Sequence, residues 1–558
     1  MPRSPFIWLL PAAVGLLLAV SMAPFSRYFL DDWVHLYLLQ EGDWGIYRFA
    51  AGEAALNQQG IHFGALPWFA TPELKITFFR PLSAALHALD GALFGRDLLP
   101  RVLHSVAWYA ALCGVVTAIF RRILPPQTAL LAAVFFAIAG AHAQPVVWLA
   151  ARNALICATL GGLGLLAHLA WRDGLRPGVV LSVIGLGAGL FAGEAGLGIV
   201  AFVVAYELVG RRDPLGRRLF ALLPAAGITL AWLVLYLAVG AGVSGSGAYL
   251  DPVHEPLRFL AHAPWRLAYV LGVVTSGISA DIWYLRPQDH TALSVLGALC
   301  ALPFLAWLGS TLAHAEPVHR RAVGWLALGA GLALIPQLAG LLGSRSVLVP
   351  SIGGTAVAAV LVVDGLGGRG GMRTVRRIGA GLLLLGHGVF AMLQWPLTGG
   401  MIASGGVTTD RALADLRAMD LPPDTPVLLV STPGPELATY ATLRGRVTGE
   451  PVPSLMPLVI GPRPVRVLRV DRLVWEVEPL EGDWIEGGFD RLYRVPGTLP
   501  TGTGVQVPPL SATVLDAVGG DPTRVRFTAN RYAVLVGWDG QHMVRVDPAL
   551  DEVVELRP

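Results

Sequence analysis

Residues 6–39 read "FIWLLPAAVGLLLAVSMAPFSRYFLDDWVHLYLL". The part before Phe25 is apolar and uncharged, and its length of about 19 residues suits a membrane-crossing helix, which needs about 20. It exceeds the apolar core of a signal peptide, about 7–15 residues. We therefore expect an uncleaved first membrane helix. Two adjacent carboxylates, Asp31 and Asp32, follow close to the expected membrane surface.

The composition of the whole chain places most of it in lipid. Of its 558 residues, 54% are hydrophobic and 14% are charged, and the mean hydropathy is +0.59. Soluble domains carry about 25% charged residues. The net charge of +3 is small and spread out, so no nucleic-acid partner is expected. Cys113, Cys157 and Cys300 lie in apolar runs without a Cys-x-x-Cys pair, which predicts neither disulfides nor a thiolate metal site.

Apolar runs of membrane-spanning character recur along the chain and predict about eleven spans. They lie near 6–24, 102–120, 127–143, 153–171, 178–193, 195–210, 219–240, 291–313, 322–343, 347–366 and 378–396.

Arginine-rich segments fall on alternate loops between these runs. Cytoplasmic loops are enriched in Lys and Arg, so the N-terminus is expected inside and the C-terminus outside. The same rule keeps the ambiguous segment 267–285 in the interface or re-entering on the outer side. The segments are Arg3, 121–122, 171–177, 211–218, 319–321 and 369–377.

Beyond residue 400 the pattern changes to short β-type runs interrupted by Pro and Gly, such as "TPVLLVSTPG" and "RPVRVLRVDRLVWEVEPL". The predicted fold is an all-α polytopic membrane domain over 1–399, with a long first outer loop over 25–100. A smaller soluble domain, mostly β or α/β, is predicted over 400–558.

The acidic pair is the first candidate site. In a helix, His35 is four residues from Asp31 and three from Asp32, so the three share a face. Two neighbouring carboxylates repel, and one pKa can rise to suit an acid or a base. The alternatives are an ordinary solvated loop start and a carboxylate–histidine metal pair.

Basic and polar residues at the outer helix ends form the second candidate set. Arg80 precedes Pro81 and a short amphipathic helix, and a guanidinium held there suits a phosphate, with a snorkelling arginine as the alternative. Ionisable residues at membrane depth are costly and usually functional. Together these residues predict a site for an anionic, lipid-linked substrate. The others are His142, Gln144, Arg152, Glu194 and Arg345.

The order of these motifs resembles the GT-C superfamily of polyprenyl-phosphate-sugar glycosyltransferases over about residues 6–366. An acidic pair follows the first helix, "FRPL" precedes the short helix, "HAQPVVWLAAR" follows, then Glu194 at a turn and "RSVLVPSIGG" late in the membrane part. The likeness is closest to the protein O-mannosyltransferase and TMTC-type branch. In that branch H-x-x-N-x-x-x-H follows the short helix, where this chain has Arg101 and His104, and the tetratricopeptide tail is missing.

The resemblance implies a membrane hexosyltransferase with a polyprenyl-phosphate-sugar donor and a protein, lipid or glycan acceptor. It implies Asp31 or Asp32 as the base, of which Asp32 is preferred, and Arg80, Arg152 and Arg345 as donor-phosphate ligands. It places the chain in a bacterial inner membrane with the C-terminal domain periplasmic. No cofactor is predicted, although the acidic pair leaves a divalent metal open. Rival functions are a lipid-linked glycan polymerase, ligase or transporter, and a non-catalytic glycan-binding envelope protein. Further site candidates are His35, His142, Gln144, Glu194, Arg101 and His104.

Overall fold

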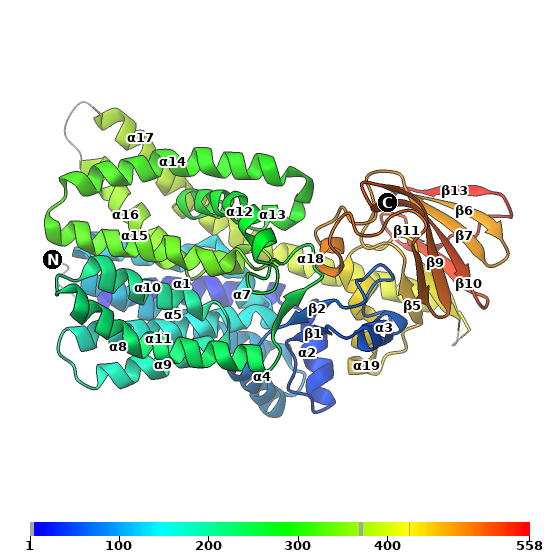
Figure 1. Cartoon of the computed structure of the whole chain (residues 1–558), viewed down its shortest axis with the longest axis horizontal. Coiled ribbons are helices and arrows are strands. Elements are labelled where there is room, and N and C mark those ends of the chain that lie inside the picture. Colours follow the sequence, from blue (N-terminus) through cyan, green and yellow to red (C-terminus); the bar gives the residue numbers. More distant parts are fainter. Residues whose placement is uncertain (1–4, 368–371, 423–424) are drawn as a thin grey trace.

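The computed structural model describes residues 5–367, 372–422 and 425–558, and it has a helical bundle at one end and a β-rich domain at the other (Figure 1). This confirms the predicted fold class of a helical membrane part followed by a mostly β or α/β domain. The helices are α1 (Leu10–Ser21), α2 (Asp31–Gln40), α3 (Ala54–His62), α4 (Pro81–Phe94), α5 (Leu98–Ile123), α6 (Pro126–Ile138), α7 (Ala143–Val147), α8 (Asn153–Arg172), α9 (Gly178–Ala192), α10 (Gly196–Ala205), α11 (Leu215–Ala238), α12 (Pro256–Ser276), α13 (Ile282–Leu285), α14 (His290–His314), α15 (Pro317–Gln337), α16 (Ser351–Gly367), α17 (Arg373–Leu384), α18 (Ala391–Ala418), α19 (Ala441–Thr448) and α20 (Asp490–Tyr493).

The bundle helices carry the apolar runs of the sequence. Within the described residues, six helices are long and apolar enough to cross a membrane, and a seventh results if α6 and the bent segment after it form one span. The apolar helices α9, α10 and α16 are shorter. Each of the eleven predicted runs lies largely on a helix, but eleven complete spans remain a prediction. The chain is a multi-pass membrane protein.

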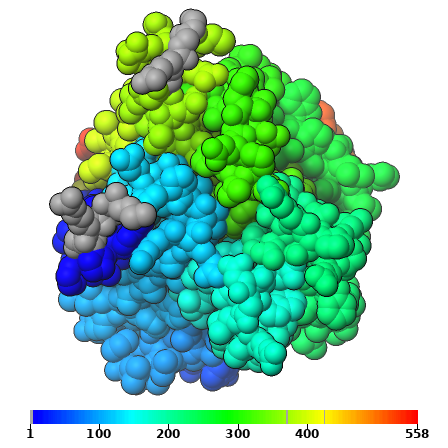
Figure 2. All heavy atoms as spheres, turned by 90° about the vertical axis from the view of Figure 1, so that its left-hand side faces the viewer, coloured from blue at the N-terminus to red at the C-terminus, as the bar shows by residue number. Residues whose placement is uncertain are grey.

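The arginine-rich loops gather at the end of the bundle that faces away from the β-rich domain. Arg122 pairs with Asp173 at 2.6 Å, and Arg211 links Asp173 to Asp213, so three of these loops meet in one ionic network. Figure 2 looks onto this end, with little of the C-terminal domain visible behind it. Arg3 and residues 369–371 of the last cluster lie outside the described residues.

The ambiguous segment 267–285 enters and leaves at the end of the bundle nearest the β-rich domain. Arg266 of α12 donates hydrogen bonds to the carbonyls of Leu338 and Gly340 at that end. After α12 ends, Asp281 accepts a hydrogen bond from the Ser344 amide, in the same outer turn. The segment therefore begins and ends at the same end of the bundle, and its placement relative to the membrane stays a prediction.

Three sheets make up the β structure of the described residues. A small antiparallel sheet, β1-β2-β3, joins the first outer loop to the segment after α11. The C-terminal domain holds an antiparallel sheet of order β13-β6-β7-β10-β9-β8 and a mixed sheet of order β12-β11-β4-β5, in which β4 pairs in parallel with β5 and β11. The strands are β1 (Arg48–Ala51), β2 (Lys75–Thr77), β3 (Gly242–Ser244), β4 (Pro426–Leu429), β5 (Ser454–Pro457), β6 (Val465–Asp471), β7 (Val474–Pro479), β8 (Gly504–Val507), β9 (Leu510–Val518), β10 (Asp521–Ala529), β11 (Val534–Trp538), β12 (Met543–Arg545) and β13 (Val553–Leu556).

The first outer loop and the C-terminal domain share one hydrophobic core. Trp68 of the loop packs edge-on against Trp484 and Phe527 of the domain. The indole nitrogens of Trp68 and Trp484 both donate to the carbonyl of Leu458. The expected boundary between 399 and 400 falls inside α18, which runs from the bundle to the β-rich domain (Figure 1). The helical bundle and the β-rich domain are therefore joined by a shared core and by a continuous helix.

Candidate active site

The site begins at the turn that starts α2. Leu30, immediately before the helix, has a φ of 47°, a backbone conformation that is rare for leucine. Strained residues of this kind cluster at functional sites. The Asp31 and Asp32 carboxylates that follow have different hydrogen-bond partners and different surroundings.

Asp32 is buried, and its carboxylate links two backbone segments. Its side chain is 2% exposed, and its two oxygens accept hydrogen bonds from the amides of Phe29, at 3.0 Å, and Ala150, at 2.7 Å. Burial raises the pKa of Asp32 to about 8. The Trp148 indole also donates to the carbonyl of Phe29, at 3.0 Å. Asp32 thus fixes the turn before α2 against the segment that precedes α8.

Asp31 lies on the wall of a cavity between the outer loops and the bundle. Its carboxylate accepts a hydrogen bond from the Tyr440 hydroxyl of the C-terminal domain at 2.7 Å. Burial raises the pKa of Asp31, while the Tyr440 hydrogen bond and the charges of Arg345 and Arg80 act to lower it. Asp31, unlike the sequence-preferred Asp32, can meet a ligand in this cavity.

The cavity has a volume of about 380 Å³. Small-molecule sites usually measure about 300–1,000 Å³ and combine apolar walls with a few polar groups. Here the polar groups that line the cavity with Asp31 include Arg80, Glu194, Tyr249 and Arg345. They come from the first outer loop, the α9–α10 turn, the segment after β3, and the turn before α16.

Arg80 and Glu194 meet across the cavity wall as an ion pair. Arg80 Nε donates to one Glu194 oxygen at 2.7 Å, and its guanidinium stacks over the Phe78 ring with 4.3 Å to the centroid. Pro81 stands at the first position of α4, as the sequence predicts, and sets the direction of the helix that follows Arg80. The other Glu194 oxygen is buried and has no hydrogen-bond partner among the described residues. An unsatisfied buried oxygen beside a cavity suits a ligand hydroxyl.

Arg345 is the cation best placed for an anion. Its guanidinium lies over the Trp148 ring, 5.5 Å from the centroid, and it forms no ion pair with any described residue. Its side chain is only partly exposed. A phosphate oxygen would complete its hydrogen bonding with strong, charge-assisted bonds.

Arg152 is placed outside the cavity, in a buried network. It is fully buried, pairs with Asp90, and donates to the Ser105 hydroxyl at 2.8 Å. His104 binds the other Asp90 oxygen at 2.7 Å, and Arg101 donates to the carbonyl of Gly95. A buried carboxylate already neutralises Arg152, so the structure gives this residue a packing role.

Three further sequence candidates lie near the site without lining the cavity. His142 is buried between the Tyr109 hydroxyl, at 3.1 Å, and the Ser351 hydroxyl, at 3.0 Å. His35 is buried among aromatic rings, and neither of its ring nitrogens has a partner in the described part of the chain. The Gln144 carbonyl oxygen is buried and unpartnered in the same way. Across residues 5–367, 372–422 and 425–558, no cluster of three or more His, Cys, Asp and Glu side chains is placed to hold a metal ion.

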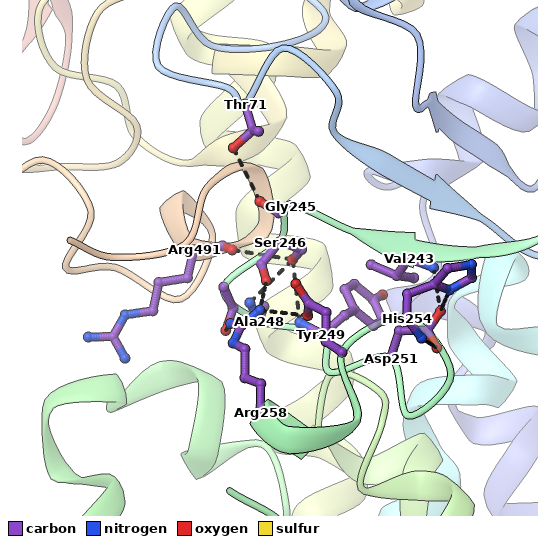
Figure 3. A network of polar contacts seen from close by, with 12 residues as sticks. Thr71, Val243, Gly245, Ser246, Ala248, Tyr249, Asp251, His254, Arg258 and Arg491 are labelled. Atoms are coloured by element: carbon purple, nitrogen blue, oxygen red, sulfur yellow. Dashed lines mark hydrogen bonds and ion pairs between the residues drawn. The ribbon is translucent and has the colours of Figure 1, made fainter. Parts of the chain in front are cut away.

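Sequence reasoning missed two contributions to the cavity. Tyr440 lies 409 residues beyond Asp31, in a segment with no motif that points to it. Asp251 and His254 form a pair on the cavity wall, with His254 Nδ1 at 2.8 Å from the Asp251 carboxylate. Their Asp-x-x-His spacing in the loop after β3 is the signal that could have found them. Figure 3 shows this pair beside Tyr249.

Comparisons with known proteins give a distant likeness in structure. No family model matches the chain, and no curated protein matches it in sequence. An oligosaccharyltransferase from Archaeoglobus fulgidus, tethered with an acceptor peptide, aligns over 82% of this chain and 64% of its own, at 12% identity and a TM-score of 0.39. The same archaeon's oligosaccharyltransferase AglB, in complex with an inhibitory peptide and a dolichol-phosphate, aligns over 81% and 65%, at 12% and 0.40.

A bacterial protein, ArnT from Cupriavidus metallidurans in the apo state, aligns over 80% of this chain and 88% of its own. The identity is 16% and the TM-score is 0.39. The present chain spans less than two thirds of the length of the two archaeal chains. Because all three TM-scores lie below 0.5, we infer function from the cavity itself.

Proposed function

We propose that the chain is a membrane glycosyltransferase of the GT-C type, which moves a sugar from a polyprenyl-phosphate donor to an acceptor hydroxyl in the Asp31 cavity. The observation that carries the proposal is that two charged side chains line one cavity at the end of the bundle. They are Arg345, which has no ion pair among the described residues, and the partly buried carboxylate Asp31. A membrane-anchored phosphate sugar needs a cation for its phosphate and a base for its acceptor, both close to the lipid.

In the proposed reaction the acceptor oxygen attacks the anomeric carbon of the sugar. Its bond to that carbon forms as the bond from the carbon to the phosphate oxygen breaks, and the polyprenyl phosphate leaves with the electron pair. Asp31 takes the proton of the acceptor hydroxyl as a general base. The direct displacement inverts the configuration at the anomeric carbon.

Charge accumulates on the phosphate as it leaves, and preorganised cations stabilise that charge. Arg345 meets it with a guanidinium that has no ion pair among the described residues, while Arg80 is held by Glu194 and by the Phe78 ring. The unpartnered Glu194 oxygen is left to accept a hydrogen bond from a sugar hydroxyl. Asp32 is a positioning residue, because its oxygens are occupied by the amides of Phe29 and Ala150.

The proposal includes a bacterial inner membrane location with the cavity on the outer side. The arginine network at the opposite end of the bundle supports this orientation through the positive-inside rule. A protein, lipid or glycan could supply the acceptor hydroxyl.

Donor binding tests the phosphate assignment directly. Arg345→Ala should weaken binding of a polyprenyl phosphate by about tenfold or more, since a lost charge-assisted hydrogen bond costs about 1.5–3 kcal/mol. The thermal midpoint in detergent should hardly change, because Arg345 forms no ion pair among the described residues. Arg557→Ala, at an exposed arginine paired only with Glu555, is the matched control. Unchanged donor affinity in Arg345→Ala would remove this residue from the site and weaken the proposed function.

A further inference from the structure

A second, larger cavity lies between α12, α13, the start of α14 and the C-terminal domain. Its volume is about 600 Å³. Leu250 and Leu341 line both this cavity and the Asp31 cavity, so one layer of side chains separates the two. Nothing in the proposed reaction has used this space so far.

The second cavity is positively charged. Arg258, Arg266 and Arg491 line it, and among the described residues that line it there is no Asp or Glu. Arg258 is paired with Glu255 at 2.9 Å, outside the lining, but the other two arginines form no ion pair in the described ranges. Two guanidiniums without an ion-pair partner among the described residues therefore border this cavity, where they attract an anion.

Each of the two unpaired arginines is positioned by neutral groups. Arg266 is 7% exposed and donates to three backbone carbonyls, those of Leu338, Gly340 and Ala248. The carbonyl of Arg491 accepts hydrogen bonds from the loop amides of Gly247 and Ala248, which fixes its backbone. In Figure 3 the Arg491 side chain points away from the loop that its own carbonyl holds. Its only side-chain hydrogen bond in the described structure is a long one, 3.4 Å, to the carbonyl of Ile485.

Aromatic faces complete the cavity. Trp265 on α12 is 54% exposed although it lines the cavity, and Trp283 lies opposite, stacked on His290 with ring centroids 3.7 Å apart. Aromatic walls with a few oriented polar groups are typical of small-molecule sites. The apolar C–H face of a sugar ring packs well on such a surface.

We propose that this second cavity binds an acidic saccharide, a sugar ring carrying a phosphate or carboxylate, and that this saccharide is part of the acceptor. Arg491 and Arg266 hold the acidic group, and Trp265 packs on the ring. The thin wall at Leu250 and Leu341 places the saccharide beside the Asp31 cavity. The assignment of this saccharide to the acceptor rests on the proposed function, whereas the binding of an acidic saccharide does not.

Calorimetry with the purified full chain tests the binding. Glucose 6-phosphate should bind at least tenfold more tightly than glucose, and inorganic phosphate should compete with it. Arg491→Ala should lose about tenfold or more in affinity for glucose 6-phosphate, while Arg557→Ala, outside both cavities, should bind it normally. Trp265→Ala should weaken glucose 6-phosphate but leave inorganic phosphate unchanged.

Several results would overturn the proposal. Equal affinity of the unaltered chain for glucose and glucose 6-phosphate would show that the cavity does not recognise an acidic group. This comparison does not depend on any variant folding correctly. Normal affinity in Arg491→Ala would rule out this cavity as the binding site. A short-chain phosphatidylinositol 4-phosphate carries a comparable polyhydroxylated six-membered ring with a phosphate monoester, attached to a lipid. Tighter binding of this lipid than of glucose 6-phosphate would assign the saccharide to a membrane headgroup, and the reverse would assign it to a free glycan.

The two proposals fail separately. If Arg491→Ala raises the KM for an acidic acceptor and leaves donor binding unchanged, both stand. If the chain transfers no sugar but Arg491→Ala still weakens glucose 6-phosphate, the glycosyltransferase proposal falls and the saccharide site remains.

Discussion

At the scale of single residues, neighbouring carboxylates have separate tasks. Asp31 and Asp32 stand side by side in sequence, yet only Asp31 reaches the cavity, while Asp32 accepts two backbone amides. The sequence predicts that one of the pair is the base but not which, because the choice depends on the strained turn at Leu30 and on the distant Tyr440. Arg80, Glu194 and Arg345, which the sequence predicts as site candidates from their outer positions, line the cavity with Asp31. Arg152 could not be placed, since its partner Asp90 lies on another helix without a motif.

Asparagine substitutions separate the two aspartates. Asp31→Asn keeps the shape but removes the base, so turnover with a radiolabelled polyprenyl-phosphate sugar should fall about 10²–10⁴-fold with donor binding intact. Asp32→Asn leaves one amide without an acceptor, so it should mainly lower the thermal midpoint. Near-normal turnover in Asp31→Asn would exclude this residue as the base, and a loss confined to Asp32→Asn would restore the sequence preference.

Tyr440 provides a test through pH. Burial raises the pKa of Asp31, and the Tyr440 hydroxyl opposes that rise by stabilising the charged form. A base works only when deprotonated, so kcat/KM should fall as pH drops through this pKa. Tyr440→Phe should raise the pKa further and move the acidic limb of the profile to higher pH. Tyr493→Phe, which lacks a hydrogen bond to Asp31, should leave the limb in place. If the acidic limb of the pH profile does not move in Tyr440→Phe, that limb does not report the protonation of Asp31.

At the scale of elements, the apolar runs of the sequence predict the helices. They do not predict the packing between α2 and the C-terminal domain. The amphipathic helix after Arg80 is confirmed as α4, and its proline stands at the first helical position. Local sequence suffices there, because period and capping act over a few residues. By contrast, the Trp33 indole of α2 donates to Glu436 at 3.1 Å across 403 residues. Such a contact depends on the tertiary fold, and no local pattern predicts it.

Glu436 makes this contact sensitive to pH. Burial raises the pKa of Glu436 from 4.5 to about 7, so the folded state prefers the neutral carboxyl. Folding stability should therefore be highest below pH 4.5 for this group and fall as pH rises through 7. Glu436→Gln stays neutral and keeps an acceptor for Trp33, so it should stabilise the chain at pH 8 by at most about 3 kcal/mol and have little effect at pH 5. Thermal midpoints at the two pH values check this, and an equal shift at both would refute it.

At the scale of the whole molecule, the predicted two-part order is present but the parts are joined. The change from long apolar runs to short β-type runs predicts a β-rich C-terminal domain, which the structure has. The core shared by Trp68, Trp484 and Phe527 had no sequence signal, because Trp68 lies 416 residues before Trp484 and no local pattern links the two segments. Side chains that pack only after two distant segments meet leave no periodic pattern in either one.

Topology can be tested on the intact chain. The arginine network lies opposite the C-terminal domain, so this domain should be outside the cytoplasm. Alkaline phosphatase fused after Pro558 should be active, and the same enzyme fused after Arg176, in an arginine-rich loop, should be inactive. A fluorescent cytoplasmic reporter should give the opposite pattern. Fluorescence from a fusion after Pro558, with inactive phosphatase there, would reverse the proposed orientation.

The hydrogen bond from Tyr440 to Asp31 has a consequence for biosynthesis. The carboxylate emerges from the ribosome first, and its hydroxyl partner emerges 409 residues later. Until that final portion has been translocated and has docked on the first outer loop, Asp31 has no Tyr440 to hold it and the shared core is open. The pocket around Asp31 would therefore take its final form only after the segment that contains Tyr440 has docked.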